Sequence, residues 1–245
     1  MSIECIDLSM EVEPGVNPNY PDHPWYELRP IVTHATGAFE SNGVAMFLHA
    51  GSHVDAPYHF DQTGAKVDEV PLENLVGYAM VLDVSDAEPG ERIDGDRLAR
   101  AKEQALAAGA RYEAGMIALV RTDWSERAAP PAEAWWQDGP FLDRSAAQWL
   151  VDEKFASVGF DFPQDKLGGD MERLKALKSG DTRLEDMEDP PLPVHVVLLT
   201  NGICQIENIA RLKDVPVTGA IVCAAPLLLD GAEAAPARVV AIVER

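Results

Sequence analysis

Residues 49–60 read His49-Ala50-Gly51-Ser52-His53-Val54-Asp55-Ala56-Pro57-Tyr58-His59-Phe60. Three of the six histidines of this 245-residue chain fall in this segment, where an even distribution would place about 0.3. A β-strand sends alternate side chains to the same face. An extended segment would therefore gather the imidazoles and the carboxylate between positions 49 and 55 on one side.

A helix explains the same segment less well. It would pair His49 with His53 but turn Asp55 away from them, and glycine, valine and proline at 51, 54 and 57 all disfavour it. In a strand, Gly51 would leave room between the imidazoles for an ion. Pro57 would end the strand, so that His59 could reach in from a turn. The sequence predicts an extended segment from His49 to Asp55.

This set of side chains predicts a catalytic metal site. Imidazole and carboxylate groups bind zinc, manganese or iron, and two histidines with one aspartate leave coordination positions open for water. A bound metal would generate hydroxide at neutral pH and polarise a carbonyl. His59, as a neutral imidazole, could take the proton of the water and return it to the leaving group.

A second polar pair lies in the C-terminal third, where His195 and Glu207 flank an apolar stretch. If Asn201-Gly202 formed a hairpin turn, these two side chains would point to opposite faces. A helix that starts near Pro193 and stops at Gly202, followed by a strand ending at Glu207, would bring both inward. Spacing alone leaves both structures open and does not identify either residue as a ligand.

The rest of the chain predicts a mixed α/β fold in a single domain covering residues 1–245. Helical spacing spans Asp96 to Ala108, with Asp96 as N-cap and Gly109 as a stop, and Ser145 to Glu153, with Ser145 as cap. A polar excursion at 164–193 could contain a short helix at 171–178 or act as a lid. Trp135 and Trp136, in a loop at 128–141, could pack or line a pocket. Strands are expected from apolar runs at residues 3–8, 44–48, 79–84, 116–120, 156–160, 220–224 and 238–243.

Composition narrows the classes of partner. A formal net charge of −21 excludes attraction to a nucleic-acid backbone. No run of 18 apolar residues exists and the first residues lack a signal-peptide pattern, so neither membrane insertion nor export is expected. Three scattered cysteines predict no disulfide framework and fit a cytoplasmic protein.

Five segments, taken in order, resemble the cyclase family of metal-dependent hydrolases, which includes bacterial kynurenine formamidase and isatin hydrolase. Residues 49–60 are similar to the family signature, with Ser52 replacing the usual threonine. Gln164 departs from the serine that the family usually has there, and 164–193 is longer than in compact kynurenine formamidases. The remaining segments are Pro71–Gly77, Val120–Trp124, Gly159–Pro163 and His195–Asn208.

The resemblance implies a set of roles. His49, His53 and Asp55 would hold one metal; Asp55, His195 and Glu207 would hold a second and Asp55 would bridge them. His59 would be the general acid and base. The family also implies a swivelling β/β/α fold, one or two zinc or manganese ions per subunit, and a homo-oligomer with aromatic residues near the subunit boundary.

The expected activity is hydrolysis of an amide, cyclic amide or lactone by metal-bound hydroxide. The first candidate substrates are small aromatic amides: N-formylkynurenine, for an arylformamidase of tryptophan catabolism, and isatin. Two alternatives stay open. The same groups could close a ring by dehydration, or the protein could bind a metal or ligand without turnover.

Overall fold

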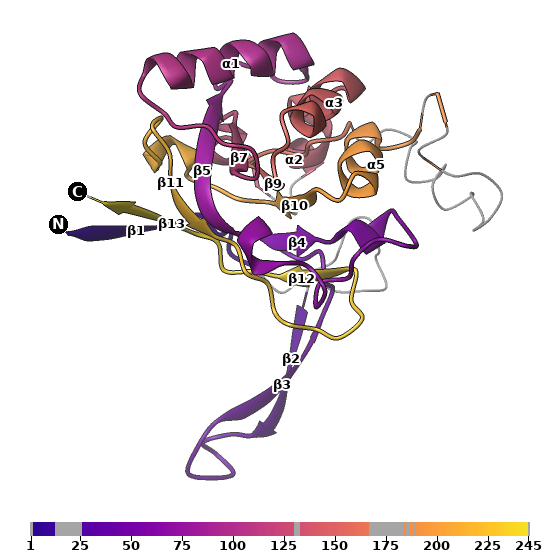
Figure 1. Ribbon diagram of the computed structural model, residues 1–245. Coiled ribbons are helices and arrows are strands. Elements are labelled where there is room, and N and C mark those ends of the chain that lie inside the picture. Colours follow the sequence, from indigo (N-terminus) through magenta and orange to yellow (C-terminus); the bar gives the residue numbers. More distant parts are fainter. Residues whose placement is uncertain are drawn as a thin grey trace.

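A nine-stranded mixed sheet organises the chain in a computed structural model that describes residues 2–12, 26–129, 133–166, 184, 187–188 and 190–244 (Figure 1). The strand order is β1-β13-β11-β5-β7-β9-β10-β4-β12. The first half of these strands is β1 (Ile3–Asp7), β4 (His53–Asp55), β5 (Val76–Asp83), β7 (Ile117–Arg121) and β9 (Ser157–Phe160). The others are β10 (Cys204–Glu207), β11 (Ala220–Cys223), β12 (Ala234–Pro236) and β13 (Val240–Glu244).

The centre of the sheet is parallel. Strands β5, β7, β9 and β10 pair in parallel, and antiparallel strands extend the sheet on both sides. Along β5, Met80 and Leu82 pack into one apolar cluster while Ala79 and Val81 pack into another. Both faces of the central strands are therefore buried, as apolar parallel strands require.

Within the described residues, four helices cover one face of the sheet, where Figure 1 shows them together. They are α1 (Gly95–Ala107), α2 (Glu133–Asp138), α3 (Arg144–Asp152) and α5 (Pro193–Thr200). The mixed α/β prediction is confirmed, and so are all seven predicted strands in position, with shifted ends. The segment predicted at 44–48 lies in β3 (Ser41–Met46), which pairs with β2 (Tyr26–Val32), a strand that was not predicted. The short strands β6 (Arg92–Ile93) and β8 (Phe141–Leu142) form a separate parallel pair.

The two predicted helices exist, but their predicted N-caps are wrong. The side chain of Asp94 accepts from the Arg97 amide at the start of α1, and that of Asp143 accepts from Ala146 at the start of α3. The Ser145 hydroxyl instead accepts from the amide of Gly95 and so links the two helices. An aspartate stands two residues ahead of each predicted cap and takes its place. The helix predicted at 171–178 lies outside the described residues.

The tryptophan pair belongs to the core. Trp135 in α2 is fully buried in the cluster between helices and sheet, and Trp136 packs against it. Packing is thus the correct alternative for these indoles. Among the described helices, none has the length and apolar character needed to cross a membrane.

Candidate metal centre

Two neighbouring antiparallel strands place four polar side chains on one face. In the register of β10 with β4, Glu207 lies opposite His53 and Gln205 lies opposite Asp55. Directly opposite residues share a face, and so do residues two apart in one strand. The pairing therefore gathers a histidine, two carboxylates and an amide in the interior, where each is less than 10% exposed.

Buried atoms without partners mark the centre of this group. The ring of His53 uses Nδ1 against the carbonyl oxygen of Gly51 at 2.9 Å, which leaves Nε2 bare and without a hydrogen bond. Both carboxylate oxygens of Asp55 also receive no well-aligned hydrogen bond, although Asp55 is fully buried and His49 Nδ1 lies 2.8 Å from Oδ1. Leaving such atoms unpaired is costly. A divalent cation would satisfy all three, so the donor set fits a metal ion.

The segment before His53 is not the extended strand that the sequence predicts. β4 begins at His53, and His49 lies in a turn. Gly51 interrupts the strand because it has φ +61, a conformation that glycine adopts without strain. Its open face receives Val12, whose Cγ2 would lie 2.2 Å from a Cβ at position 51. Gly51 thus makes room for Val12, and the prediction that it makes room for an ion is wrong.

His49 nevertheless reaches Asp55 from its turn. Its Nδ1 lies 2.8 Å from Asp55 Oδ1, and its Nε2 lies 3.5 Å from Glu233 Oε1. His53 Nε2 lies 3.3 Å from the same Oδ1. Two imidazoles therefore face one oxygen of the carboxylate.

The other oxygen of Asp55 faces a different pair of rings. His195 Nε2 lies 3.7 Å from Oδ2, and His59 Nε2 lies 3.9 Å from it. Asp55 therefore separates two groups of nitrogen donors, one at each of its oxygens. This is the arrangement that a bridging carboxylate requires.

Two sets of donor atoms lie close enough to hold an ion among the described residues. One is His49, Asp55 and His59, and the other is His53, Asp55 and Glu207, each with its atoms within 4.8 Å of one another. Asp55 belongs to both. The resemblance assigns His49 and His53 to the same ion, but here they fall in different groups. His195 belongs to neither group.

For His195 and Glu207, the helix-and-strand alternative is correct. α5 begins at Pro193, the chain turns at Gly202 with φ +78, and β10 ends at Glu207. The apolar residues of α5 pack into the core, which holds the helix against the sheet. His195 Nε2 then lies 3.0 Å from Glu207 Oε1.

Asp165 orients His195, and the sequence did not reveal it. One of its oxygens accepts from the amide of Val194 and the other from the amide of His195, so it caps the start of α5. The second oxygen also lies 2.6 Å from His195 Nδ1. Such a carboxylate leaves Nε2 facing the centre, as carboxylates behind metal-binding histidines do. Thirty positions separate the two residues, and no motif spacing links them.

The surroundings of His59 and His49 shift the pKa values of these two imidazoles in opposite directions. Burial lowers the pKa of His59 to about 4, and the charges of His49 and His195 act in the same direction against the attraction of Asp55. Burial also favours neutral His49, but Asp55 and Glu233 outweigh it and raise its pKa to about 10. His59 is therefore a neutral base at pH 7, with its side chain 26% exposed.

Aromatic rings line the histidines. The ring of Phe60 lies 4.8 Å from that of His59 and 5.2 Å from that of His195, between centroids. The ring of Phe47 lies 5.3 Å from that of His49.

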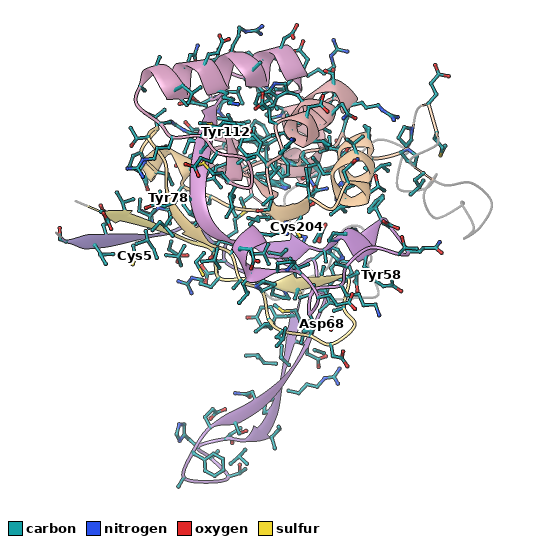
Figure 2. The ribbon with its side chains drawn as sticks, in the orientation of Figure 1. Cys5, Tyr58, Asp68, Tyr78, Tyr112 and Cys204 are labelled. Atoms are coloured by element: carbon teal, nitrogen blue, oxygen red, sulfur yellow. The ribbon has the colours of Figure 1, made fainter. Side chains whose placement is uncertain are left out.

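Cys204 is buried near the site, and Figure 2 shows it in the interior between the helices and β4. Burial raises the pKa of its thiol to about 12, with the charge of Asp55 acting in the same direction.

The amino-acid sequence is similar to one protein family and to two kinds of hydrolase. The family model Cyclase, described as "Putative cyclase", matches residues 6–164. Isatin hydrolase of Roseibium aggregatum is 27% identical over 221 residues, which cover 84% of this chain and 76% of that protein. Kynurenine formamidase of Bacillus cytotoxicus is 26% identical over 238 residues, which cover 97% of this chain and 96% of that protein.

Solved structures of the same kinds of protein are similar to this chain in fold. An isatin hydrolase bound to the product analogue thioisatinate superposes with a TM-score of 0.78 at 23% identity, covering 99% of this chain and 93% of that one. A potential metal-dependent hydrolase with cyclase activity has a TM-score of 0.70 at 25% identity, with both chains fully covered. The swivelling fold expected from the resemblance is thereby confirmed. Motif, fold and relatives place this chain in the cyclase family of metal-dependent hydrolases.

Proposed function

We propose that this enzyme hydrolyses an amide, cyclic amide or lactone attached to an aromatic ring, with isatin and N-formylkynurenine as the first substrates to test. The observation that carries the proposal is the set of buried acceptor atoms on His53 and Asp55 that receive no well-aligned hydrogen bond, beside a neutral His59. The names of the relatives supply the two substrates. Phe47 and Phe60 offer apolar contacts to a flat ring beside the histidines.

We propose that His49, His53 and Asp55 hold one divalent ion, zinc or manganese. In an enzyme that binds two ions, His195 and Glu207 are the side chains that would complete the second position with Asp55. When bound, such an ion lowers the pKa of a coordinated water and polarises the carbonyl of the substrate. The donor set of imidazole and carboxylate groups suits either metal.

His59 moves the proton in this proposal. As a neutral imidazole it accepts the proton of the attacking water, and the resulting imidazolium then donates it to the departing nitrogen or oxygen. Asp55 Oδ2 lies 3.9 Å from His59 Nε2 and stabilises the charged ring between these two steps. Since the proton is returned, the residue ends each cycle in its starting form.

We also propose a homo-oligomer that resides in the cytoplasm. The support for the oligomer is the exposed apolar surface of the β2–β3 hairpin, which extends away from the sheet (Figure 1). Three free cysteines support a reducing compartment.

The experiment that tests the activity is elemental analysis of the purified protein together with hydrolysis of both substrates, before and after chelation. We expect bound metal and turnover that a chelator abolishes and added zinc or manganese restores. Asp55→Asn should lose metal and turnover, whereas Asp152→Asn, an exposed carboxylate on α3, should keep both. Turnover that survives complete removal of metal would overturn the proposal.

A further inference from the structure

Gln164 places an amide group between the ligands expected for a second ion. Its side chain is buried, at 3% exposure, and its backbone oxygen accepts from the amide of Leu142. The amide nitrogen Nε2 hydrogen bonds to Glu207 Oε1 and lies 3.4 Å from His195 Nε2. A third contact, at 2.6 Å, reaches Gln205 Oε1.

The orientation of this amide follows from its partners. An ionised Glu207 only accepts hydrogen bonds, so it requires the NH₂ group of Gln164 rather than its carbonyl oxygen. A rotated amide would place the carbonyl oxygen against that carboxylate and leave the NH₂ group elsewhere in the interior. Glu207 therefore keeps the hydrogen atoms of Gln164 pointing into the space that it shares with His195.

An N–H donor in this space excludes a cation. His195 Nε2 and Glu207 Oε1 lie 3.0 Å apart, and Gln164 Nε2 donates to the same Glu207 oxygen, so an ion bound between these two atoms would have to displace the amide. The position at Asp55 Oδ1 differs, because imidazole nitrogens of His49 and His53, which bind an ion when neutral, face this oxygen at 2.8 and 3.3 Å. One position is thus open to an ion, and the other is filled by an amide.

We propose that Gln164 fills the position at His195 and Glu207 and thereby limits this enzyme to one divalent ion per chain. The inference rests on the proposed function, since it presupposes the ion at Asp55 Oδ1. Gln164 acts here as a residue that sets metal stoichiometry, and it takes no part in proton transfer.

Metal stoichiometry tests the proposal directly. The metal-free wild type, Gln164→Ala and Gln164→Glu are titrated with Mn²⁺ by calorimetry, and bound manganese is measured after gel filtration. We expect one ion per chain in the wild type and two in both variants, with Gln164→Glu adding a carboxylate where the amide stood. Gln148→Ala, which removes an exposed glutamine of α3, should stay at one.

Electron paramagnetic resonance gives an independent readout. Two Mn²⁺ ions bridged by a carboxylate lie about 3.5–4 Å apart, so the variants should show the spectrum of a coupled pair and the wild type that of a single ion. Gln164→Glu has nearly the same shape as glutamine, which keeps the test valid if Gln164→Ala unfolds.

The outcomes separate this inference from the proposed function. Two ions in the wild type, or one ion in both folded variants, would overturn the role of Gln164 and leave the hydrolase intact. Weaker binding of the first ion in Gln164→Ala would also overturn it, because Gln164 would then be a ligand. A wild type that binds no metal would instead overturn the proposed function.

Discussion

Asp55 is the residue on which the site depends. Its carboxylate is fully buried among imidazoles, and although burial opposes ionisation, the charges of His49 and His53 hold its pKa well below the usual range. The same crowding acts oppositely on His59, which stays neutral. One buried group is thus kept charged and its neighbour uncharged, a separation typical of acid–base sites.

His59→Asn tests the role of proton transfer. Because a general acid–base group contributes about 10²–10⁴-fold, we expect kcat to fall by at least about 10²-fold while metal content stays unchanged. Steady-state kinetics and elemental analysis measure the two quantities. His34→Asn, which changes an exposed histidine of the hairpin, is the control. Loss of metal from His59→Asn would make His59 a ligand, a role that its closeness to His49 and Asp55 permits.

Asp161, in the segment that follows β9, gives a pH prediction for stability. Burial raises its pKa to about 7, and hydrogen bonds from Thr122 and the amide of Asp123 oppose the shift only in part. In the unfolded chain its pKa is about 3.9. Between these values the native state holds a proton that the unfolded state lacks, so stability falls as pH rises.

Urea unfolding of the metal-free protein between pH about 4 and about 7 checks this sign. The free energy of unfolding of the wild type should decrease with pH relative to that of Asp161→Asn, which cannot titrate. Parallel curves for the two proteins would show that Asp161 keeps the same charge throughout.

The turn before strand β4 positions His49, the first histidine of the site. Gly51 has two requirements there, a positive φ and space for Val12. Gly90 has a similar φ, +70, but nothing within 4 Å of where its Cβ would lie. Substituting Gly90 by alanine therefore tests the backbone strain alone, whereas substituting Gly51 tests the strain together with the steric clash against Val12.

Gly51→Ala should destabilise the protein more than Gly90→Ala. A left-handed conformation costs a non-glycine residue about 1–2 kcal/mol, and forcing a methyl group into a filled space adds about 1–3 kcal/mol. We expect only the first cost for Gly90→Ala and both for Gly51→Ala, together with weaker metal binding as His49 shifts. Chemical denaturation and metal titration measure these effects. Equal destabilisation of the two variants would contradict this prediction, because it would mean that Val12 moves aside without a loss of stability.

At the scale of the whole molecule, the arm, residues 26–46, stands apart from the body (Figure 1). Leu28 and Val44 lie directly opposite each other in its ladder, and they are 56% and 63% exposed. Ile31 and Phe39 are 70% and 60% exposed. An isolated two-stranded hairpin is at best marginally stable in water, so we expect a second copy of this chain to cover it.

Sedimentation equilibrium tests the arm. We expect a dimer or larger assembly for the wild type and a monomer for Leu28→Lys combined with Val44→Lys, because two charges would be buried without partners. The double variant Leu72→Lys with Leu106→Lys, which changes exposed leucines outside the arm, makes the same change of charge and should keep the assembly. A monomeric wild type would contradict the prediction.

Local sequence patterns were enough to predict the class of fold and the main chemistry. Apolar runs identify β5, β7 and β9, three of the four central parallel strands, because both faces of these strands are buried and their pattern does not depend on which neighbour covers them. The crowding of His49, His53, Asp55 and His59 likewise predicts a metal site, and the structure brings these side chains together, although through a turn at Gly51 rather than an extended strand. Capping was predictable only to within two residues, because aspartates stood close to both chosen caps.

Long-range packing determines how distant parts of the chain complete the site. Spacing left a hairpin and a helix equally open for residues 195–207, and the choice depends on the apolar side chains of α5 packing into the core. The turn at Gly51 depends on Val12, 39 positions away. Gln164 and Asp165 reach His195 across about thirty positions. Contacts of this kind arise from the packing of the whole sheet, which local sequence patterns do not record.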